Sequence, residues 1–222
     1  MTVLLLFGAA LAAHAQGAEW ETLNDEAKSL YQKGQYDRAV VVAKKALDAA
    51  EKALGRNHPS LAASLNNLAL LYYVQGQYAQ AEPLYTRALA IDEKALGPDH
   101  PDVAVKLNNL AALYYAQGRY AQAEPLYTRA LAIREKALGP NHPDVAVNLT
   151  NLAELYRAQG RYAQAEPLYT RALAIDEKAL GPNHPHVARC LENLAALYRR
   201  TGRGKTAEAM EKRAAAIRAI KR

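Results

Sequence analysis

The sequence predicts an all-α protein, an α-solenoid of five helix-turn-helix units and about ten antiparallel helices. Residues 65–91 recur almost unchanged from Leu107 and, with more substitutions, from Leu149, so that successive copies are equally spaced. Glycines follow the same spacing, at Gly34, Gly76, Gly118, Gly160 and Gly202. Alternating runs of Val, Ile and Thr, which are typical of strands, do not occur. A fixed period of this kind indicates repeats that stack on their neighbours.

Each repeat is expected to be a helical hairpin. Before the glycine, apolar residues such as Leu65, Leu68 and Tyr72 are spaced three and four apart, which places them on one face of a helix. A second apolar stripe with helical spacing covers residues 81–91. The intervening Gly76 is suited to the tight turn that joins the two helices.

A linker is expected between successive hairpins. In residues 97–102, Gly97 suits the left-handed conformation that closes a helix and Pro98 prevents the helix from continuing. Pro101 then suits the first turn of the next helix. The repeats are expected to span approximately residues 19–54, 59–96, 101–138, 143–180 and 185–222, the last acting as a C-terminal cap.

Three prolines fall inside the predicted second helices, where a proline removes a hydrogen bond and bends the chain. They follow the turn by about six residues, so we expect them in the opening turns of these helices, each at a mild bend. These residues are Pro83, Pro125 and Pro167.

The N-terminus has a different composition from the repeats. The apolar run over residues 3–13 is shorter than the roughly 20 residues that a membrane-spanning helix needs. Ala13-His14-Ala15 follows it and is typical of a signal-peptide cleavage site. We therefore expect residues 1–15 to be a signal peptide cleaved after Ala15, and a secreted or periplasmic protein without a transmembrane segment. The alternatives are a buried capping helix or a misassigned start, with a cytoplasmic location.

Positive charge is concentrated at the C-terminal end. Residues 199–222 contain nine Lys or Arg and two Glu, a net charge of +7, so the rest of the chain carries −1 of the total of +6. We expect a solvated terminal cap; binding of nucleic acid or of an anionic membrane or polymer surface is the alternative. The single cysteine, Cys190, lies among Leu and Ala and is expected to be buried as a small apolar residue.

The repeat resembles the tetratricopeptide repeat at its turn, packing and aromatic positions. The residues that carry the resemblance are Ala69, Tyr72, Gly76, Tyr78, Ala81, Tyr85 and Ala88. The period of 42 residues exceeds the roughly 34 of the ordinary repeat. Together with the LNNLAxLY and AEPLYxRALAI segments and the Gly-Pro linker, this length resembles the kinesin light chain subtype. The resemblance covers residues 19–222 and implies a right-handed superhelix whose leading helices form a concave, peptide-binding groove.

Catalytic and metal sites are not expected. Zinc needs several ligands about 2.1 Å from one ion, whereas the linker histidines lie one repeat apart and are expected to serve as linker and capping residues. These are His58, His100, His142 and His184. Phosphate-binding Gly-rich loops and the H-E-x-x-H and G-x-S-x-G motifs do not occur. We therefore expect no enzyme, no cofactor and no small-molecule substrate.

The candidate binding residues are those at which the leading helices differ between copies. If these helices form the inner wall, its exposed positions are the residue before a repeated Asn and those four and seven residues later. Tyr73 and Tyr115 have no evident core role beside Tyr72 and Tyr114, which favours such a wall. The candidates are Asn24, Lys28, Tyr31, Asn66, Tyr73, Asn108, Tyr115, Thr150, Glu154, Arg157, Arg199 and Arg200, with Leu70, Ala112, Glu192 and Ala196 between them. An ordinary solvated face is the alternative interpretation.

The residue types of this wall favour a peptide ligand. Asn side chains pair with peptide backbone, and Tyr combines apolar area with a polar tip. Arg binds carboxylates, so an acidic segment of the peptide is expected near Arg157, Arg199 and Arg200. We therefore predict an exported scaffold that binds a protein or peptide segment. A second Asn series is unbroken and is expected to bond between helices: Asn67, Asn109, Asn151 and Asn193.

Overall fold

Ten consecutive helices make up the described part of the chain, residues 19–220, in a computed structural model. The first covers residues 19–32. The others are α2 (Tyr36–Leu54), α3 (Pro59–Val74), α4 (Tyr78–Leu96), α5 (Pro101–Ala116), α6 (Tyr120–Leu138), α7 (Pro143–Ala158), α8 (Tyr162–Leu180), α9 (Pro185–Arg200) and α10 (Gly204–Ile220). No strand occurs among residues 19–220, and the predicted all-α fold is confirmed.

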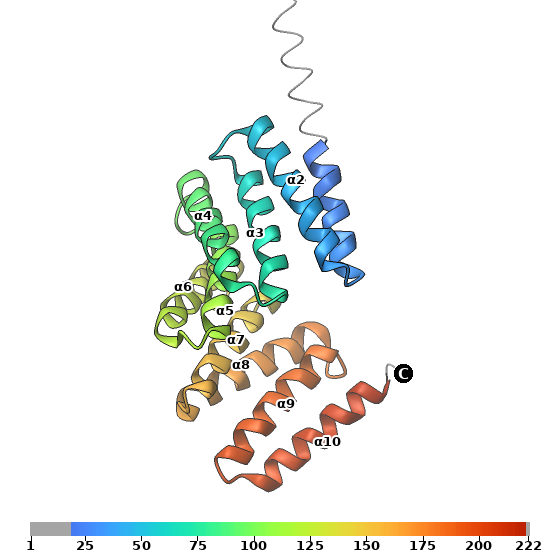
Figure 1. Cartoon of the computed structure of the whole chain (residues 1–222). Coiled ribbons are helices and arrows are strands. Elements are labelled where there is room, and N and C mark those ends of the chain that lie inside the picture. Colours follow the sequence, from blue (N-terminus) through green and yellow to red (C-terminus); the bar gives the residue numbers. More distant parts are fainter. Residues whose placement is uncertain (1–18, 221–222) are drawn as a thin grey trace, which may run out of the picture. The chain divides into compact units, whose positions relative to one another are not determined.

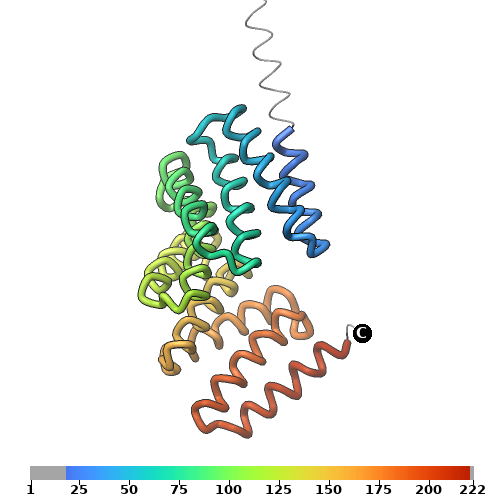
Figure 2. The backbone as a smooth tube through the Cα atoms, in the orientation of Figure 1, coloured from blue at the N-terminus to red at the C-terminus, as the bar shows by residue number. Residues whose placement is uncertain are grey.

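Contacts divide the chain into two compact units, with the boundary inside α5. The first unit ends at Leu113, and the second unit begins at Tyr114. In the first unit, α2 packs on α3 and α3 on α4 (Figure 1). In the second unit, α6 packs on α7, and each later helix packs on the next as far as α10 (Figure 2). Contacts within a hairpin therefore alternate with contacts between hairpins, which is the arrangement of a solenoid.

Glycine closes the leading helix of each hairpin. Gly76 has a φ of +72°, a conformation that side chains with a Cβ atom rarely adopt. Its N–H donates to the Tyr73 carbonyl at 3.0 Å, and the Gln77 N–H donates to the Tyr72 carbonyl at 2.8 Å. This pair of bonds satisfies carbonyls at the end of α3 and turns the chain back into α4.

The linker glycines differ from the prediction. Gly97 has a φ of 90° and a ψ of 155°, which is an extended conformation essentially restricted to glycine. The expected left-handed helical conformation was therefore wrong at this position. The large ψ leads the chain away from the end of α4 instead of adding another turn to it.

The linker histidines cap the helices that follow them, as predicted. In each linker the His Nδ1 accepts a hydrogen bond from the backbone N–H two residues later, at 3.1–3.2 Å. Each bond satisfies one of the N–H groups that a helix start leaves without a partner. Within residues 19–220, no group of three or more His, Cys, Asp or Glu residues is placed to hold a metal ion. The capping pairs are His58 with Ser60, His100 with Asp102, His142 with Asp144 and His184 with His186.

The second helices bury small residues around one large ring. In α4, Ala81, Tyr85 and Ala88 are almost fully buried. The small alanines allow neighbouring helices to approach closely, and the Tyr85 ring fills the space between them. Pro83 lies inside α4 and is exposed, and Pro125 and Pro167 take the same place in α6 and α8. Their position inside these helices agrees with the prediction, whereas the bend at each remains a prediction.

Ion pairs connect the second helix of one repeat to the next repeat. An arginine donates to a glutamate that lies 36 or 37 residues earlier in the chain. The pairs are Arg87–Glu51 (2.6 Å), Arg161–Glu124 (2.6 Å), Arg171–Glu135 (2.5 Å), Arg203–Glu166 (2.7 Å) and Arg213–Glu177 (2.6 Å). Each pair ties one repeat to the next at the surface.

These pairs predict a loss of stability in acid. Hydrogen bonds from Arg87, Arg161 and Arg203 hold the pKa values of Glu51, Glu124 and Glu166 below the ordinary range. Because the folded pKa lies below the unfolded value of about 4.3, each pair stabilises the fold above that pH and its contribution is lost as pH falls through the folded pKa.

The measurement is the urea midpoint, followed by circular dichroism, between pH 7 and pH 3. We expect a plateau above roughly pH 5 and a decline below about pH 4.3. The Glu166→Gln variant removes one titrating group, so its midpoint should depend less on pH in acid. Equal acid sensitivity of the two proteins would contradict a role for the Arg203–Glu166 pair.

Candidate peptide-binding face

Two of the predicted groove asparagines are part of the packing between repeats. Asn24 and Asn66 are only 8% and 9% exposed, so the expectation that they line an open wall was wrong. The Asn67 Nδ2 donates to the Asn24 Oδ1 at 2.7 Å, and the Asn109 Nδ2 donates to the Asn66 Oδ1 at 2.8 Å. These bonds confirm the structural role predicted for Asn67 and Asn109, and they extend it to the asparagines that precede them.

The same position in the fourth repeat is also buried. Thr150 is 5% exposed, and its hydroxyl donates to the Ala146 carbonyl at 2.9 Å. Thr150 therefore has an internal partner. The prediction that it lines an open wall was wrong. The corresponding Asn108 is half-buried.

The predicted groove tyrosines pack across the hairpin turns. Each packs on the tyrosine that begins the following helix, with ring centroids 5.7 Å apart: Tyr31 on Tyr36, Tyr73 on Tyr78 and Tyr115 on Tyr120. All three groove tyrosines are half-buried, and burial raises the pKa of the Tyr73 hydroxyl above its ordinary value. The inference that Tyr73 and Tyr115 have no packing role was therefore wrong. Two tyrosines five residues apart around a turn glycine were the signal for this contact.

Two of the three predicted arginines already have carboxylate partners. Arg157 donates to Glu154 at 2.6 Å, and Arg199 donates to both oxygens of Glu211 at 2.7 and 2.5 Å. Arg200 is exposed and forms no ion pair within the described residues. Of the three, Arg200 therefore has the guanidinium that is most accessible to an acidic segment.

An apolar notch lies between the leading helices of the first two repeats. It has a volume of about 50 Å³ and is lined mainly by apolar atoms. Its residues are Ala27, Lys28, Tyr31, Asn67, Leu70 and Leu71. The notch brings together Lys28, Tyr31 and Leu70, three positions that the sequence placed on the binding wall. Lys28 also pairs with Asp25 at 3.1 Å on the exposed surface.

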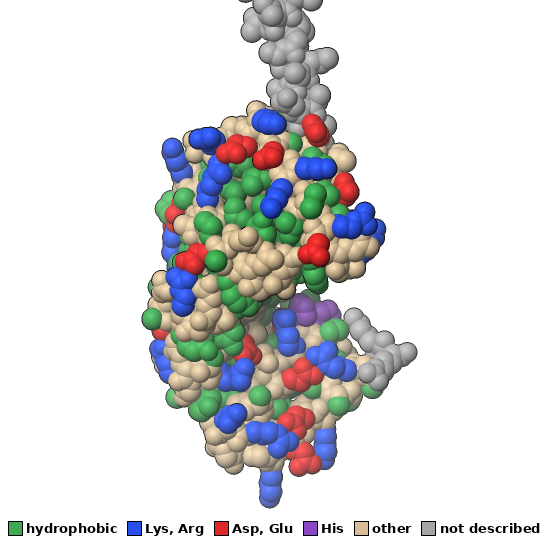
Figure 3. Space-filling model, viewed as in Figure 1, with side chains coloured by type: hydrophobic (Ala, Val, Ile, Leu, Met, Phe, Trp, Pro, Cys, Tyr) green, Lys and Arg blue, Asp and Glu red, His purple; other side chains and the backbone are tan. Residues whose placement is uncertain are grey.

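Carboxylates neutralise much of the positive charge at the C-terminal end. Five basic residues of this segment pair with glutamates: Arg199, Arg203, Lys212, Arg213 and Arg218. On the face in Figure 3, acidic side chains lie between basic ones over the C-terminal helices. This pairing reduces the charge available to a polyanion, and the arrangement favours a solvated cap over nucleic-acid binding.

Cys190 is buried as predicted, and burial raises the pKa of its thiol to about 12, which keeps the thiol protonated.

None of the described helices has the length and apolar character that crossing a membrane requires. The predicted signal peptide, residues 1–15, lies outside the described residues.

Comparisons with known proteins identify the repeat. The sequence profile of the Tetratricopeptide repeat family matches residues 21–94, 63–136, 102–178 and 144–219. A crystal structure of nearly identical TPR-like repeats of a putative kinesin light chain from Podosopora anserina is 30% identical, with a TM-score of 0.76, and the match covers 91% of this chain and 96% of that one.

Two further solved structures are similar. BtubC (BKLC) from P. vanneervenii is 29% identical, with a TM-score of 0.82, over 96% of this chain and 86% of that one. The apo form of RapI shares the fold alone, at 16% identity and a TM-score of 0.76 over 91% of this chain and 71% of that one. The comparison with curated proteins found no match. The predicted resemblance to kinesin light chain-like repeats is confirmed.

Proposed function

Because the chain belongs to the tetratricopeptide repeat family, whose members generally act as protein–protein interaction scaffolds, we propose that it binds a peptide segment of a partner protein on its leading helices and performs no catalysis. The apolar notch carries this proposal. It is a concave, apolar site between two repeats, and it coincides with positions at which the copies differ. Because the residue types at these positions differ from one repeat to the next, each repeat offers a ligand different contacts.

The notch residues suggest how a peptide is held. An aliphatic side chain of the peptide enters the space between Tyr31 and Leu70 and is removed from water there, which contributes about 25 cal/mol per Å² of apolar area buried. Asn67 uses its Nδ2 to bond Asn24, and its side-chain oxygen is left to accept from the backbone N–H of an extended peptide. The notch supplies the anchor, and the amide sets the direction of the chain beside it.

Replacing Leu70 with glutamate is expected to abolish partner capture. The substitution places a carboxylate in the apolar notch, so a peptide that inserts an aliphatic side chain there would have to remove this charge from water, which is strongly unfavourable. We expect affinity to fall at least about tenfold, or about 1.4 kcal/mol, while helical content stays unchanged. The measurement is a pull-down from the native organism with immobilised protein, with bound proteins identified by mass spectrometry, followed by titration calorimetry with the captured partner.

Val41→Glu is the matched control. Val41 is an aliphatic residue on α2 that is 54% exposed and lies outside the notch. The same charge is introduced there, so the control should capture the same partner as the wild type. Equal capture by Leu70→Glu and Val41→Glu would contradict binding at the notch.

We also propose that the protein is exported, as the apolar run and the Ala13-His14-Ala15 segment indicate. Export would place the scaffold with a partner in the periplasm or outside the cell. Amino-terminal sequencing of the protein recovered from its native organism should yield a chain that begins at Gln16. A mature chain that begins at Met1 would rule out this cleavage site.

A further inference from the structure

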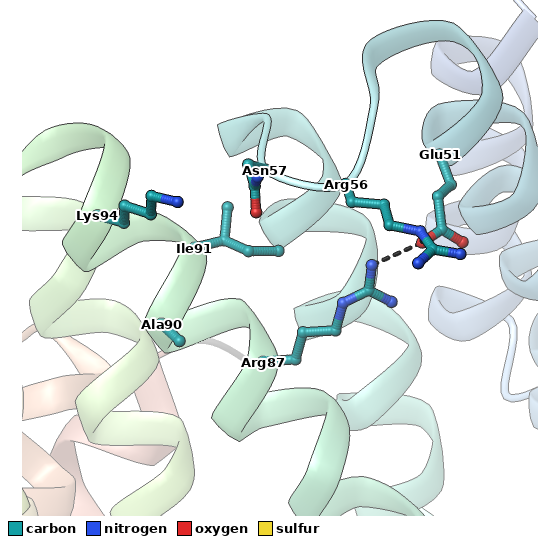
Figure 4. A pocket seen from close by; sticks show the side chains of 7 residues that line it. All are labelled: Glu51, Arg56, Asn57, Arg87, Ala90, Ile91 and Lys94. Atoms are coloured by element: carbon teal, nitrogen blue, oxygen red, sulfur yellow. Dashed lines mark hydrogen bonds and ion pairs between the residues drawn. The ribbon is translucent and has the colours of Figure 1, made fainter.

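An open cavity of about 670 Å³ lies in the first compact unit, away from the apolar notch. It forms where the end of α2, the linker over residues 55–58 and α4 meet. Its lining residues are Glu51, Arg56, Asn57, Arg87, Ala90, Ile91 and Lys94. In Figure 4, Arg56 and Arg87 approach Glu51 on one side, Lys94 lies on the other side, and Asn57 and Ile91 lie between. Three cations and one carboxylate give this cavity a formal charge of +2.

The cationic side chains of the cavity have N–H groups that form no hydrogen bond within the described residues. Arg87 donates one hydrogen bond, to Glu51 at 2.6 Å, although a guanidinium carries five N–H groups. Arg56 lies 3.6 Å from the same carboxylate, and its side chain is 84% exposed. Lys94 has no ion-pair partner among the described residues. One carboxylate therefore serves two arginines, and the remaining donors are available to a ligand.

In the fourth and fifth repeats, the arginine at the corresponding place has a second partner in the linker. The residue that corresponds to Arg56 is a proline there, and its carbonyl takes a second bond from the arginine. Arg171 donates to the Pro140 carbonyl at 2.7 Å, and Arg213 donates to the Pro182 carbonyl at 3.5 Å. Arg87 makes no such bond, so its free N–H groups remain at the cavity. At the first linker, the departure from the repeat thus adds a cation and leaves arginine N–H groups without a protein partner.

We propose that this cavity binds a phosphate monoester group. Such a group carries about −1.5 to −2 charges at pH 7, which matches the cavity, and it offers three acceptor oxygens. The planar guanidinium of Arg87 binds two of these oxygens side by side, and Lys94 contributes a point charge. The Asn57 amide donates to the third oxygen. Ile91 and Ala90 provide apolar contact for the carbon atoms of the ester.

Two sources present this chemistry, a small phosphorylated metabolite and a phosphorylated side chain of a protein, and the experiment separates them. Backbone amide spectra of the ¹⁵N-labelled protein are recorded during titration with O-phosphoserine and with a pentapeptide that has phosphoserine at its centre. Unphosphorylated serine and the unphosphorylated peptide are the blanks. We expect saturable shifts confined to residues 51–57 and 87–94 with the phosphorylated probes alone. Tighter binding of the peptide assigns a protein source, and tighter binding of the free amino acid assigns a metabolite.

Arg56→Pro tests the site with a residue that the chain itself uses in its other linkers, so the fold should be retained, as thermal denaturation will check. We expect at least tenfold weaker binding in Arg56→Pro and in Lys94→Gln. Lys178→Gln, which changes the corresponding lysine of α8, should bind as the wild type does. Shifts spread over all lysines and arginines, no saturable shift at all, or unchanged affinity in Arg56→Pro would overturn the proposal. The site is independent of the apolar notch, so Leu70→Glu should leave phosphate binding intact.

Discussion

Replacing Lys106 with alanine is expected to destabilise the first compact unit by about 3–5 kcal/mol, because the substitution leaves a buried carboxylate without its counter-charge. The Lys106 Nζ lies 3.1 Å from the Asp92 Oδ2, and the two side chains are 9% and 2% exposed. The other oxygen of Asp92 has no hydrogen-bond partner within the described residues. Lys106 is therefore the charged group that compensates for the burial of Asp92. The measurement is urea denaturation followed by circular dichroism.

The chain supplies its own control for this experiment. Between the first two repeats, the positions of Asp92 and Lys106 are occupied by Ala50 and Ser64, which are also buried. The double variant Asp92→Ala/Lys106→Ser therefore reproduces a pair that already packs in this fold. It should recover most of the stability lost in Lys106→Ala, because removal of both partners leaves no uncompensated charge. A loss below about 1 kcal/mol in Lys106→Ala would mean that water or a shifted side chain reaches Asp92.

The repeats can be predicted from the sequence because their packing uses the same residue types in every copy. Leu65, Ala69 and Tyr72 are buried, and equivalent residues recur at the same place in the following repeats. The turn at Gly76 and the cap at His58 are also local, since each depends on a few neighbouring residues. Such features can be predicted because the relevant partners lie close together in the chain.

The binding face is harder to predict from the sequence, because helical spacing does not distinguish a residue that faces solvent from one that faces the next repeat. Helical spacing predicts that Asn66 lies on an open wall, yet its side-chain oxygen accepts a hydrogen bond from Asn109, one repeat and one residue further along the chain. A polar residue in such an interface has the same periodicity as one in water. The packing of Tyr73 on Tyr78 is hard to predict for a related reason, since this contact crosses the turn instead of following the helix.

The buried ion pair cannot be predicted from the sequence by local patterns. Asp92 ends one hairpin and Lys106 begins the next, so neither belongs to a local motif. Charged residues are also rarely buried unless they are paired, which makes solvent the default expectation for each one separately. The pair becomes visible only when the two repeats are packed together. The apolar notch shares this property, because its two walls come from different repeats.

The same comparison between repeats predicts that Cys190→Lys stabilises the second compact unit. Asp176 and Cys190 occupy the positions of Asp92 and Lys106 two repeats later in the chain. Asp176 is 3% exposed, its Oδ1 has no partner within residues 19–220, and its Oδ2 accepts only the weak S–H donor of Cys190 at 3.5 Å. Lysine at position 190 would bring an ammonium group to this carboxylate, as Lys106 does for Asp92.

The expected gain is roughly 1–3 kcal/mol, the penalty for a buried polar group left without a full partner, reduced by the rotamer entropy that an ordered lysine loses. Cys190→Met is the control, because methionine fills a similar space without a charge. Urea denaturation should rank Cys190→Lys above the wild type and above Cys190→Met. A Cys190→Lys protein no more stable than Cys190→Met would show that the counter-charge does not offset its own desolvation, and that the Asp92–Lys106 pair depends on packing that the fourth and fifth repeats do not share.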